Sequence, residues 1–227
     1  MTALTIPFLP FENLCVSEIA KEMEHLKRHD LSFTPWAEFP YKPEAGFVIG
    51  HGGDSIYLKF YVTENHVQAF NLLPNSPVHH DSCVEFFISL DDDDNYYNLE
   101  FNCSGTCNFG YGPDRHQRSA ISNDQISKVQ YQSSFRTANA AGLSLVSWEL
   151  TLTIPFDVFS YHRLSSFSGQ ACRVNFYKCG DLLFAPHYLS WAPIYSDQPN
   201  FHLPEFFVDA RFSEQIQLRE NLILNDH

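Results

Sequence analysis

The amino-acid sequence predicts an all-β protein, a single antiparallel β-sandwich with one short N-terminal helix. Short runs of alternating apolar and polar residues follow one another, with turn residues between them and without alternating helices. Aromatic residues reach 15%, with 21 Phe and 11 Tyr, which is enough for a large core. The 13 prolines are scattered along the chain and would interrupt long helices. We therefore expect residues 1–227 to form one sandwich domain.

Composition and charge exclude several classes of protein. The net charge is −13, and four acids stand together at Asp91–Asp94, so a surface that binds nucleic-acid phosphates is not expected. A basic partner or a metal ion remains compatible with this charge. There is no run of about 18 apolar residues, so no membrane span is expected. The first 15 residues carry no Lys or Arg and contain Pro7 and Pro10, which argues against a secretory signal. If Met1 is the natural start, the expected location is the cytoplasm.

The expected helix covers Val16–His29 and should lie on the surface of the sandwich. Its apolar residues recur at the helical spacing, and Ser17 stands close to an N-cap position. The residues of this apolar stripe are Val16, Ile19, Ala20, Met23 and Leu26.

The first strands show the period of two most clearly. From Asp54 onward, apolar residues at every second position predict a half-buried strand, and a second strand covers Cys83–Leu90. A third strand begins at Tyr96 and has one polar face, which lies beside the Glu85 face of its expected partner. The residues on that polar face are Tyr96, Asn98, Glu100 and Asn102.

Later strands and two long loops complete the expected fold. The further strands are Val129–Phe135, Ser144–Ile154, Cys172–Lys178, His187–Trp191 and Phe206–Phe212. Glycine and proline residues predict loops over Gly105–Gln125 and Ser190–Pro204. Loops of that length in a compact domain are often functional.

Two glutamates are the strongest candidates for chemistry. Glu85 and Glu100 would lie on one face of neighbouring strands, joined by a tight connection. They could be the acid and the nucleophile of a retaining glycosidase, which needs about 5 Å between its carboxyl groups. They could equally accept hydrogen bonds from sugar hydroxyls. A third interpretation is a structural pair neutralised by one of three cations, which are Arg115, Arg118 and Arg173.

Metal sites receive little support from the sequence. Asp91 and Asp93 are candidate calcium ligands, but the aspartate run lacks the spaced pattern of a calcium loop, and a solvated turn explains it better. The six cysteines include no C-x-x-C pair, which gives weak support for zinc. Cys83 and Cys103 stand inside strand-like runs, where a free cysteine usually behaves as a small buried hydrophobe.

Aromatic residues outside the regular strands could stack on a sugar. Trp191 and Phe201 flank the proline-rich loop, where an exposed ring could cover the apolar face of a sugar while nearby amides bind its hydroxyls. For Trp191, anchoring of the loop in the core is the preferred interpretation. Trp148 shares a face with apolar neighbours and is expected in the core.

Five segments, taken in order, resemble a known family. They are DSCVEFFISLD (81–91), YYNLEFNCSG (96–105), VSWELTLTIPFDVF (146–159), RVNFYKCGD (173–181) and FHLPEFFVDARF (201–212). With this set the chain resembles the family 9 carbohydrate-binding modules, within the DOMON-like sandwiches, over most of Ile56–Phe212. The resemblance implies a jelly-roll sandwich that binds sugars, often at chain ends, between two Trp rings. Such modules are attached to xylanases and related enzymes.

The resemblance also implies a set of ligand contacts. The Glu of the family's D-S-V-E strand becomes Glu85, and the second clamp ring, Trp in the family, becomes Phe201. The first ring would fall at Val78 or His79, and neither is a Trp. Glu100 stands where the best-known pattern has Arg, which reverses a charge. The remaining polar positions carried over are Asn102, Asn175, Tyr177, Gln198 and Asn200.

The leading hypothesis is therefore a protein that binds a mono- or oligosaccharide and needs no cofactor, with calcium left open. The expected ligand contacts are Glu85, Glu100, Asn102, Asn175, Tyr177, Gln198 and Phe201. Two alternatives stay open: a small glycoside hydrolase that uses Glu85 and Glu100, and a non-catalytic interaction domain whose acidic surface meets a basic partner.

Overall fold

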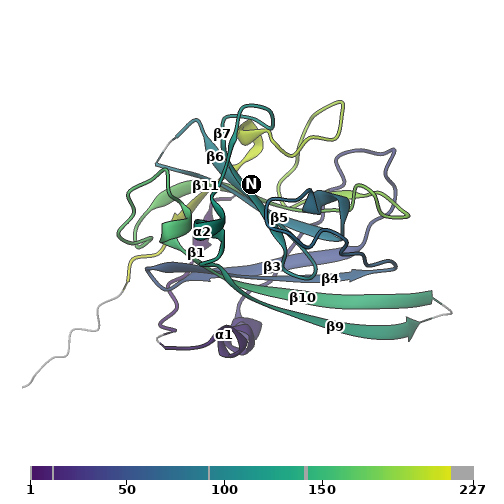
Figure 1. The fold of residues 1–227 in the computed structure, drawn as a ribbon, viewed down its shortest axis with the longest axis horizontal. Coiled ribbons are helices and arrows are strands. Elements are labelled where there is room, and N and C mark those ends of the chain that lie inside the picture. The colour runs from purple at the N-terminus through teal and green to yellow at the C-terminus, as the bar shows by residue number, and fades with distance from the viewer. Residues whose placement is uncertain (1, 12, 92, 141–142, 216–227) are drawn as a thin grey trace, which may run out of the picture.

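Two β-sheets lie face to face in the computed structural model, which describes residues 2–11, 13–91, 93–140 and 143–215 (Figure 1). The eight-stranded sheet has the order β1 (Leu4–Ile6), β13 (Val208–Phe212), β11 (Ala171–Cys179), β5 (Cys83–Leu90), β6 (Tyr96–Asn102), β7 (Cys107–Gly112) and β8 (Ser119–Ala120), with β12 (Tyr188–Ser190) also paired to β11. The five-stranded sheet has the order β2 (His29–Asp30), β3 (Glu44–His51), β4 (Ser55–Glu64), β10 (Leu143–Pro155) and β9 (Gln130–Ala140). The predicted all-β sandwich is confirmed.

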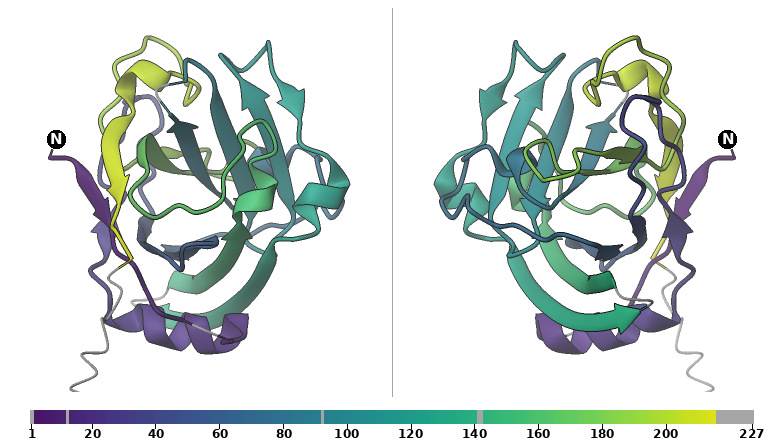
Figure 2. Two further views of the ribbon diagram at one scale, coloured as in Figure 1. Left: turned by 90° about the vertical axis from the view of Figure 1, so that its left-hand side faces the viewer. Right: turned by 90° about the vertical axis from the view of Figure 1, so that its right-hand side faces the viewer.

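The strand pairs are antiparallel apart from β1 and β13, which are parallel. These two strands come from opposite ends of the described chain and lie side by side (Figure 2). The helical segments are short. They are α1 (Val16–Glu22), α2 (Asn123–Ile126) and the 3₁₀ turns η1 (Met23–His25), η2 (Val78–His80), η3 (Phe156–Val158) and η4 (Pro204–Phe206). Among the described residues, none of these helices is long and apolar enough to cross a membrane.

The main core lies between the two sheets and follows from the period of two along each strand. Phe176 of β11 stacks on Phe47 of β3, with ring centroids 3.6 Å apart, and on Phe86 of β5 at 5.0 Å. Burial of each such side chain contributes about 1.5–3 kcal/mol to folding. Trp148 and Trp191 are also buried in this core, as expected for both.

One buried ion pair joins the two sheets inside this core. Lys178 of β11 places its Nζ 3.0 Å from Oε2 of Glu64 of β4, and both side chains are fully buried. Trp148 Nε1 donates to Oε1 of Glu64 at 2.7 Å. Burial and the charge of Lys178 lower the pKa of His187 to about 3, so its neutral ring accepts a hydrogen bond from Lys178 at 2.7 Å. Each member of the pair therefore has a further protein partner, Trp148 for Glu64 and His187 for Lys178.

A second cluster covers the outer face of the eight-stranded sheet. This is the face that the sequence predicts to be polar. We name it the outer cluster. Its buried members are Trp36, Val78, Cys83, Phe87, Tyr96, Tyr177, Cys179, Ile194, Phe201 and Phe207. The segment 191–203 has no regular secondary structure, which confirms the predicted loop, and several of its residues fold back onto this face. The outer face is therefore covered by loops and keeps only a restricted opening to solvent.

The predicted helix is too long. α1 ends at Glu22 and is followed by η1, after which Leu26 is extended. His29 then pairs with Phe47 as part of β2, so sheet pairing replaces the last helical turn. Ile19 and Met23 pack on Val48 and Tyr57, side chains of the outer face of the five-stranded sheet. α1 lies along the outside of that sheet, which confirms the expected surface position (Figure 2).

The sequence did not predict the short strands β1 and β2, the strand β3 or the hairpin of β7 and β8, and glycines explain the last two misses. In β3, a Cβ at Gly46 would lie 2.8 Å from the backbone oxygen of His29, and one at Gly50 would lie 2.2 Å from Leu9. In β7, a Cβ at Gly112 would lie 2.3 Å from the backbone oxygen of Gln117. These glycines permit close approach inside a sheet, although in the sequence they look like turn residues. The predicted loop at 105–125 therefore contains β7, β8 and α2.

Candidate functional site

A cavity of about 390 Å³ opens on the outer face of the eight-stranded sheet. Strands β5, β6 and β11 form its floor, and η2 and the segments around 115–118, 181–188 and 199–202 form its walls. Its lining residues are His79, Glu85, Glu100, Arg115, Arg118, Cys179, Asp181, Tyr188, Pro199, Asn200, Phe201 and His202. The cavity is therefore polar at its floor and carries aromatic rings in one wall.

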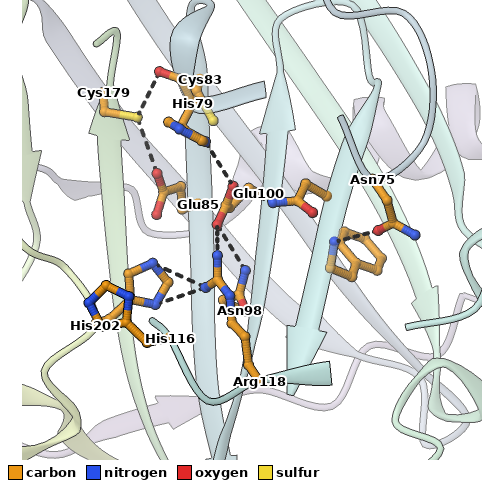
Figure 3. Close-up of polar contacts among 12 residues, drawn as sticks. Asn75, His79, Cys83, Glu85, Asn98, Glu100, His116, Arg118, Cys179 and His202 are labelled. Atoms are coloured by element: carbon orange, nitrogen blue, oxygen red, sulfur yellow. Dashed lines mark hydrogen bonds and ion pairs between the residues drawn. The ribbon is translucent and has the colours of Figure 1, made fainter. Parts of the chain in front are cut away.

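Glu85 and Glu100 form the floor of this cavity. They stand directly opposite each other on β5 and β6, as the sequence predicts, and both point to the outer face (Figure 3). Their exposed fractions are only 3% and 2%. Two buried carboxyl groups that lie side by side need hydrogen bonds or ion pairs from the protein. Glu85 and Glu100 obtain them from different residues.

Glu100 is held as a charged acceptor. Asn98 donates to its Oε1 at 2.9 Å, and Asn108 of the next strand donates to its Oε2 at 3.0 Å. His79 and Arg118 add ion pairs, each at 3.6 Å (Figure 3). Burial alone would raise the pKa of Glu100, but His79, Arg118 and Asn108 together lower it. The contact with Glu100 in turn raises the pKa of His79.

The surroundings of Glu85 favour its neutral form. Burial, reinforced by the nearby charge of Glu100, raises the pKa of Glu85 well above its usual range. Its Oε1 accepts a hydrogen bond from the thiol of Cys179 at 3.1 Å, and no hydrogen bond to its Oε2 is found within the described residues. Glu85 therefore presents a carboxyl group to the cavity that can both donate and accept a hydrogen bond.

Arg118 and His202 form one wall. Nη1 of Arg118 lies 3.0 Å from Nδ1 of His202, which also contacts the hydroxyl of Tyr96 at 2.8 Å (Figure 3). Burial and the charge of Arg118 lower the pKa of His202 to about 3, so the ring is neutral and accepts from the guanidinium. Arg118 is thereby fixed between His202 and Glu100, with part of its side chain still exposed.

Asp181, Tyr188 and Asn200 lie in other parts of the wall. Burial raises the pKa of Asp181, and its buried Oδ1 has no hydrogen-bond partner within the described part of the chain. Tyr188 of β12 is half-buried and packs edge-on against Phe201. Oδ1 of Asn200 accepts from the backbone N–H of His202 at 3.0 Å, which leaves its amide nitrogen available.

Phe201 differs from its expected role. Its ring is only 7% exposed and lies parallel to that of Tyr177, with centroids 4.2 Å apart. Trp36 packs beside it at 5.7 Å. Phe201 lines the cavity, but one face of the ring is already covered, because the loop folds back onto the sheet. The expected exposed stacking platform is therefore a part of the outer cluster.

Four other predicted contacts do not line the cavity. Asn102 donates to Asp81 at 3.0 Å and accepts from the backbone of Thr106, so it stabilises the turn after β6. Asn175 accepts from the backbone N–H of Ala192 at 3.0 Å and anchors the 191–203 loop. These residues are buried and structural. Tyr177 lies beneath Phe201 and donates to its carbonyl oxygen, and Gln198 is exposed outside the cavity.

The calcium candidates Asp91 and Asp93 lie away from the cavity. Asp93 accepts hydrogen bonds from the hydroxyl of Tyr111 and from the backbone and side chain of Asn95. Asp91 is exposed, with a positive φ of 53° that fits a turn. Asp92, in the same run, lies outside the described residues. A calcium site here stays a prediction.

Several lining residues were not identified from the sequence. His79 was one of two alternatives for the first clamp ring, and the structure separates them, since Val78 is buried while His79 lines the cavity. Arg118 was one of three cations expected to neutralise the glutamates and forms an ion pair with Glu100, but its place after the unpredicted strand β7 was not foreseen. Asp181 and His202 come from loops. Loop residues follow no periodic pattern. The only sequence signal for these cavity residues is that their loops adjoin strands with a polar face.

Fold and site together define a β-sandwich with a polar ligand cavity on the outer face of one sheet. A profile described as carbohydrate-binding family 9 matches residues 16–212, which extends the similarity seen in the sequence toward the N-terminus. The chain belongs to this family, and the resemblance inferred from the sequence motifs is confirmed. The family is one of carbohydrate-binding modules. None of the curated proteins matches the chain.

Solved structures agree with this assignment. A "putative carbohydrate-binding protein" from Bacteroides uniformis is 33% identical, with 93% of this chain and 99% of that chain covered and a TM-score of 0.85. A family 9 module from Caldicellulosiruptor kristjanssonii in complex with cellotriose is 10% identical, with both chains fully covered and a TM-score of 0.57. A family 9 module from Caldicellulosiruptor kristjanssonii in complex with glucose is 9% identical, with 94% of this chain and 97% of that chain covered and a TM-score of 0.56. The last two show a shared fold.

Proposed function

We propose that this protein binds a mono- or oligosaccharide in the cavity above Glu85 and Glu100, without catalysing a reaction on it. Arg118 and Asn200 would donate hydrogen bonds to sugar oxygens, and Glu100 would accept hydrogen bonds from sugar hydroxyls. Glu85, whose pKa is raised by burial and by Glu100, would do either in its neutral form. Tyr188 and Phe201 would contact an apolar edge of the ring.

The observation that carries this proposal is the convergence of fixed donors and acceptors on one cavity. A sugar exposes hydroxyl groups that each donate and accept, so it is recognised by polar groups of both kinds held in place. Arg118 is fixed by His202 and Glu100, and Glu100 is fixed by two amides. A cavity of about 390 Å³ falls in the usual range for small-molecule sites.

The site favours hydrogen bonding over stacking. Neither candidate position for the first clamp ring, Val78 or His79, holds a Trp, and the second ring, Phe201, is largely covered. Sugar hydroxyls exchange water for protein partners almost evenly, so the affinity should be modest. The ligand preference should depend on which hydroxyls reach the charged floor.

The test is calorimetry on the full chain with a panel of sugars that includes glucose and cellotriose, preceded by a glycan array. Arg118→Ala should weaken binding about tenfold or more, because a hydrogen bond from a charged group contributes about 1.5–3 kcal/mol. Arg136→Ala is the matched control, since Arg136 is exposed on β9 of the other sheet. Melting temperatures would show that both variants are folded.

Two results would contradict the proposal. One is the absence of any sugar that binds the unmodified protein across the array. The other is a sugar whose affinity is the same in the Arg118→Ala and Arg136→Ala variants.

The hydrolase alternative has weaker support. The opposed carboxyl groups and their divided pKa values suit an acid and a nucleophile. However, both oxygens of Glu100 are already bound by amides, with His79 and Arg118 beside them, so it is placed as a fixed acceptor. We expect no turnover of aryl glycosides. Turnover that Glu85→Gln and Glu100→Gln each abolish would reverse this conclusion.

A further inference from the structure

Two cysteines from distant parts of the chain meet beside the cavity, which Cys179 lines. Cys83 of β5 and Cys179 of β11 are direct neighbours across these antiparallel strands. Glu85 follows Cys83 by two residues, so it lies on the same face of β5. One ligand atom from each of the three side chains lies within 4.8 Å of the other two, and all three residues are buried. Within the described residues, this is the one such group of metal-ligand side chains.

The polar contacts of the two thiols are with each other, with Glu85 or with backbone oxygens. The thiol of Cys179 donates to Oε1 of Glu85 at 3.1 Å, and its Sγ lies 3.7 Å from the backbone oxygen of His79 (Figure 3). The thiol of Cys83 lies 3.7 Å from the backbone oxygen of Val84 and is also hydrogen-bonded to the thiol of Cys179. Both cysteines are free thiols. A hydrogen bond therefore links the sulfur of Cys179 to the carboxyl group of Glu85, and a metal ion bound by both could replace its proton.

The donor set indicates which ions would bind. Zinc binds thiolate sulfur at about 2.3 Å and carboxylate oxygen at about 2.0–2.2 Å in a tetrahedron, so neighbouring ligand atoms are separated by roughly 3.3–3.8 Å. The distance from Cys179 Sγ to Glu85 Oε1 is already close to that value. Two sulfur ligands favour borderline or soft cations over calcium or magnesium.

We propose that Cys83, Glu85 and Cys179 bind a thiophilic divalent cation of the Zn²⁺ class at the floor of the cavity. Glu85 and Cys179 line the cavity, so a water molecule there would complete the tetrahedron. Each thiol that binds the ion releases its proton to solvent, and Glu85 does the same.

The charges around the site are compatible with this proposal. Two thiolates and a carboxylate carry −3, and the divalent ion reduces this to −1. Glu100, the neighbour of Glu85, carries a further negative charge, which the ion pairs with His79 and Arg118 offset. Asp181 lies in the same cavity wall, two residues after Cys179, with a buried oxygen that has no partner within the described residues.

This inference goes beyond the proposed sugar binding, although Glu85 takes part in both. The two are separable by experiment. Ion binding is measured on the sugar-free protein, and sugar binding is measured after treatment with a chelator. A protein that binds sugar but no ion contradicts only the present inference, and a protein that binds the ion but no sugar contradicts only the proposed function.

The experiment titrates the reduced, chelator-treated full chain with Co²⁺ and follows the thiolate-to-cobalt charge-transfer absorption. We expect saturation at one equivalent and loss of the signal when Zn²⁺ is added. Replacing a partner of a metal ligand costs roughly 10–100-fold in affinity, so Cys179→Ser or Cys83→Ser, which removes a direct ligand, should cost at least about a hundredfold. Glu85→Gln should also weaken binding while retaining the charge-transfer band of the two thiolates.

The matched control is Cys15→Ser, because Cys15 is exposed and far from the cavity floor. This variant should bind Co²⁺ as the unmodified protein does. The inference is overturned if the unmodified protein gives no thiolate band. It is equally overturned if the band disappears in Cys15→Ser or persists unchanged in both Cys83→Ser and Cys179→Ser. Circular dichroism, with Cys179→Ala as a second variant, shows that the signal is not lost through unfolding.

Discussion

At the scale of single residues, two identical side chains in the site have opposite pKa shifts because their surroundings differ. Glu85 and Glu100 occupy equivalent positions on neighbouring strands and are almost equally buried. Glu100 has two amide donors and two cationic neighbours, so its charged form is favoured. Glu85 has one thiol donor beside that charge, so its neutral form is favoured. One carboxyl group therefore stays an acceptor while the other gains a proton to donate.

The raised pKa of Glu85 predicts a specific dependence of stability on pH. An acid whose pKa is raised by folding contributes stability below its unfolded pKa, and that contribution is lost as the pH rises toward the folded value. Glu85→Gln cannot ionise, so the variant should gain stability relative to the unmodified protein as the pH rises above about 4.5, by up to about 1.4 kcal/mol per pH unit. Urea denaturation between pH 4.5 and 8 measures the difference.

Glu44→Gln is the control for this prediction, because Glu44 is exposed at the start of β3 and lies in water before and after unfolding. Its difference from the unmodified protein should not change with pH. If the Glu85→Gln difference were equally flat, the assignment of Glu85 as a neutral acid would be wrong.

At the scale of elements, side chains alternate along each strand, so that one face packs in the main core and the other faces outward. On β11, Val174, Phe176 and Lys178 point into the main core, whereas Tyr177 and Cys179 belong to the outer cluster. Within the main core, Lys178 meets Glu64 across the two sheets. Such a pair depends on both partners, because removal of one leaves an uncompensated buried charge.

Lys178→Met should therefore lower the free energy of unfolding by about 3–5 kcal/mol, the usual cost of breaking a buried pair. The double variant Glu64→Leu with Lys178→Met should be less destabilised than Lys178→Met alone, because neither charge remains. The exposed pair of Lys128 and Asp157, at 2.8 Å, supplies the control. Lys128→Met should cost no more than about 1 kcal/mol. Urea denaturation would refute the prediction if the two lysine variants lost equal stability.

At the scale of the whole molecule, the cavity joins segments that are far apart in the chain. Its floor comes from β5, β6 and β11, and its walls include His79, Arg118 and the 199–202 segment. A ligand that contacts floor and walls together binds the folded protein and cannot bind the unfolded chain in the same way. Binding is then linked to global stability and to the local stability of the loops.

A bound sugar should accordingly stabilise the folded protein. At a free concentration of 100 times its Kd, the expected gain in unfolding free energy is about 2.7 kcal/mol. Amide hydrogen exchange should slow most in the cavity walls, around 115–118 and 199–202, and hardly at all in β9 of the other sheet. Slower exchange in β9 alone would place the sugar elsewhere. Calorimetric unfolding with and without the sugar provides the first measurement.

The sequence predicted the main strands well because burial on one face imposes a period of two. It failed at β3 and β7, where Gly46, Gly50 and Gly112 look like turn residues but permit close packing inside the sheet. It placed Glu85 and Glu100 correctly because neighbouring strands bring equivalent faces together. It misplaced Asn102, Asn175 and Tyr177, which share the polar face but are used by turns and loops as internal hydrogen-bond partners.

By itself, the sequence determined the sandwich class, the family and the opposed glutamates, because these follow from local periodicity and from short ordered motifs. Only the tertiary structure decided how the loops close over the polar face. That closure buries Phe201 and brings Arg118 and His202 to the cavity, and sheet pairing sets Cys83 beside Cys179. These contacts join residues distant in the chain, and no local pattern of residues encodes such a distance.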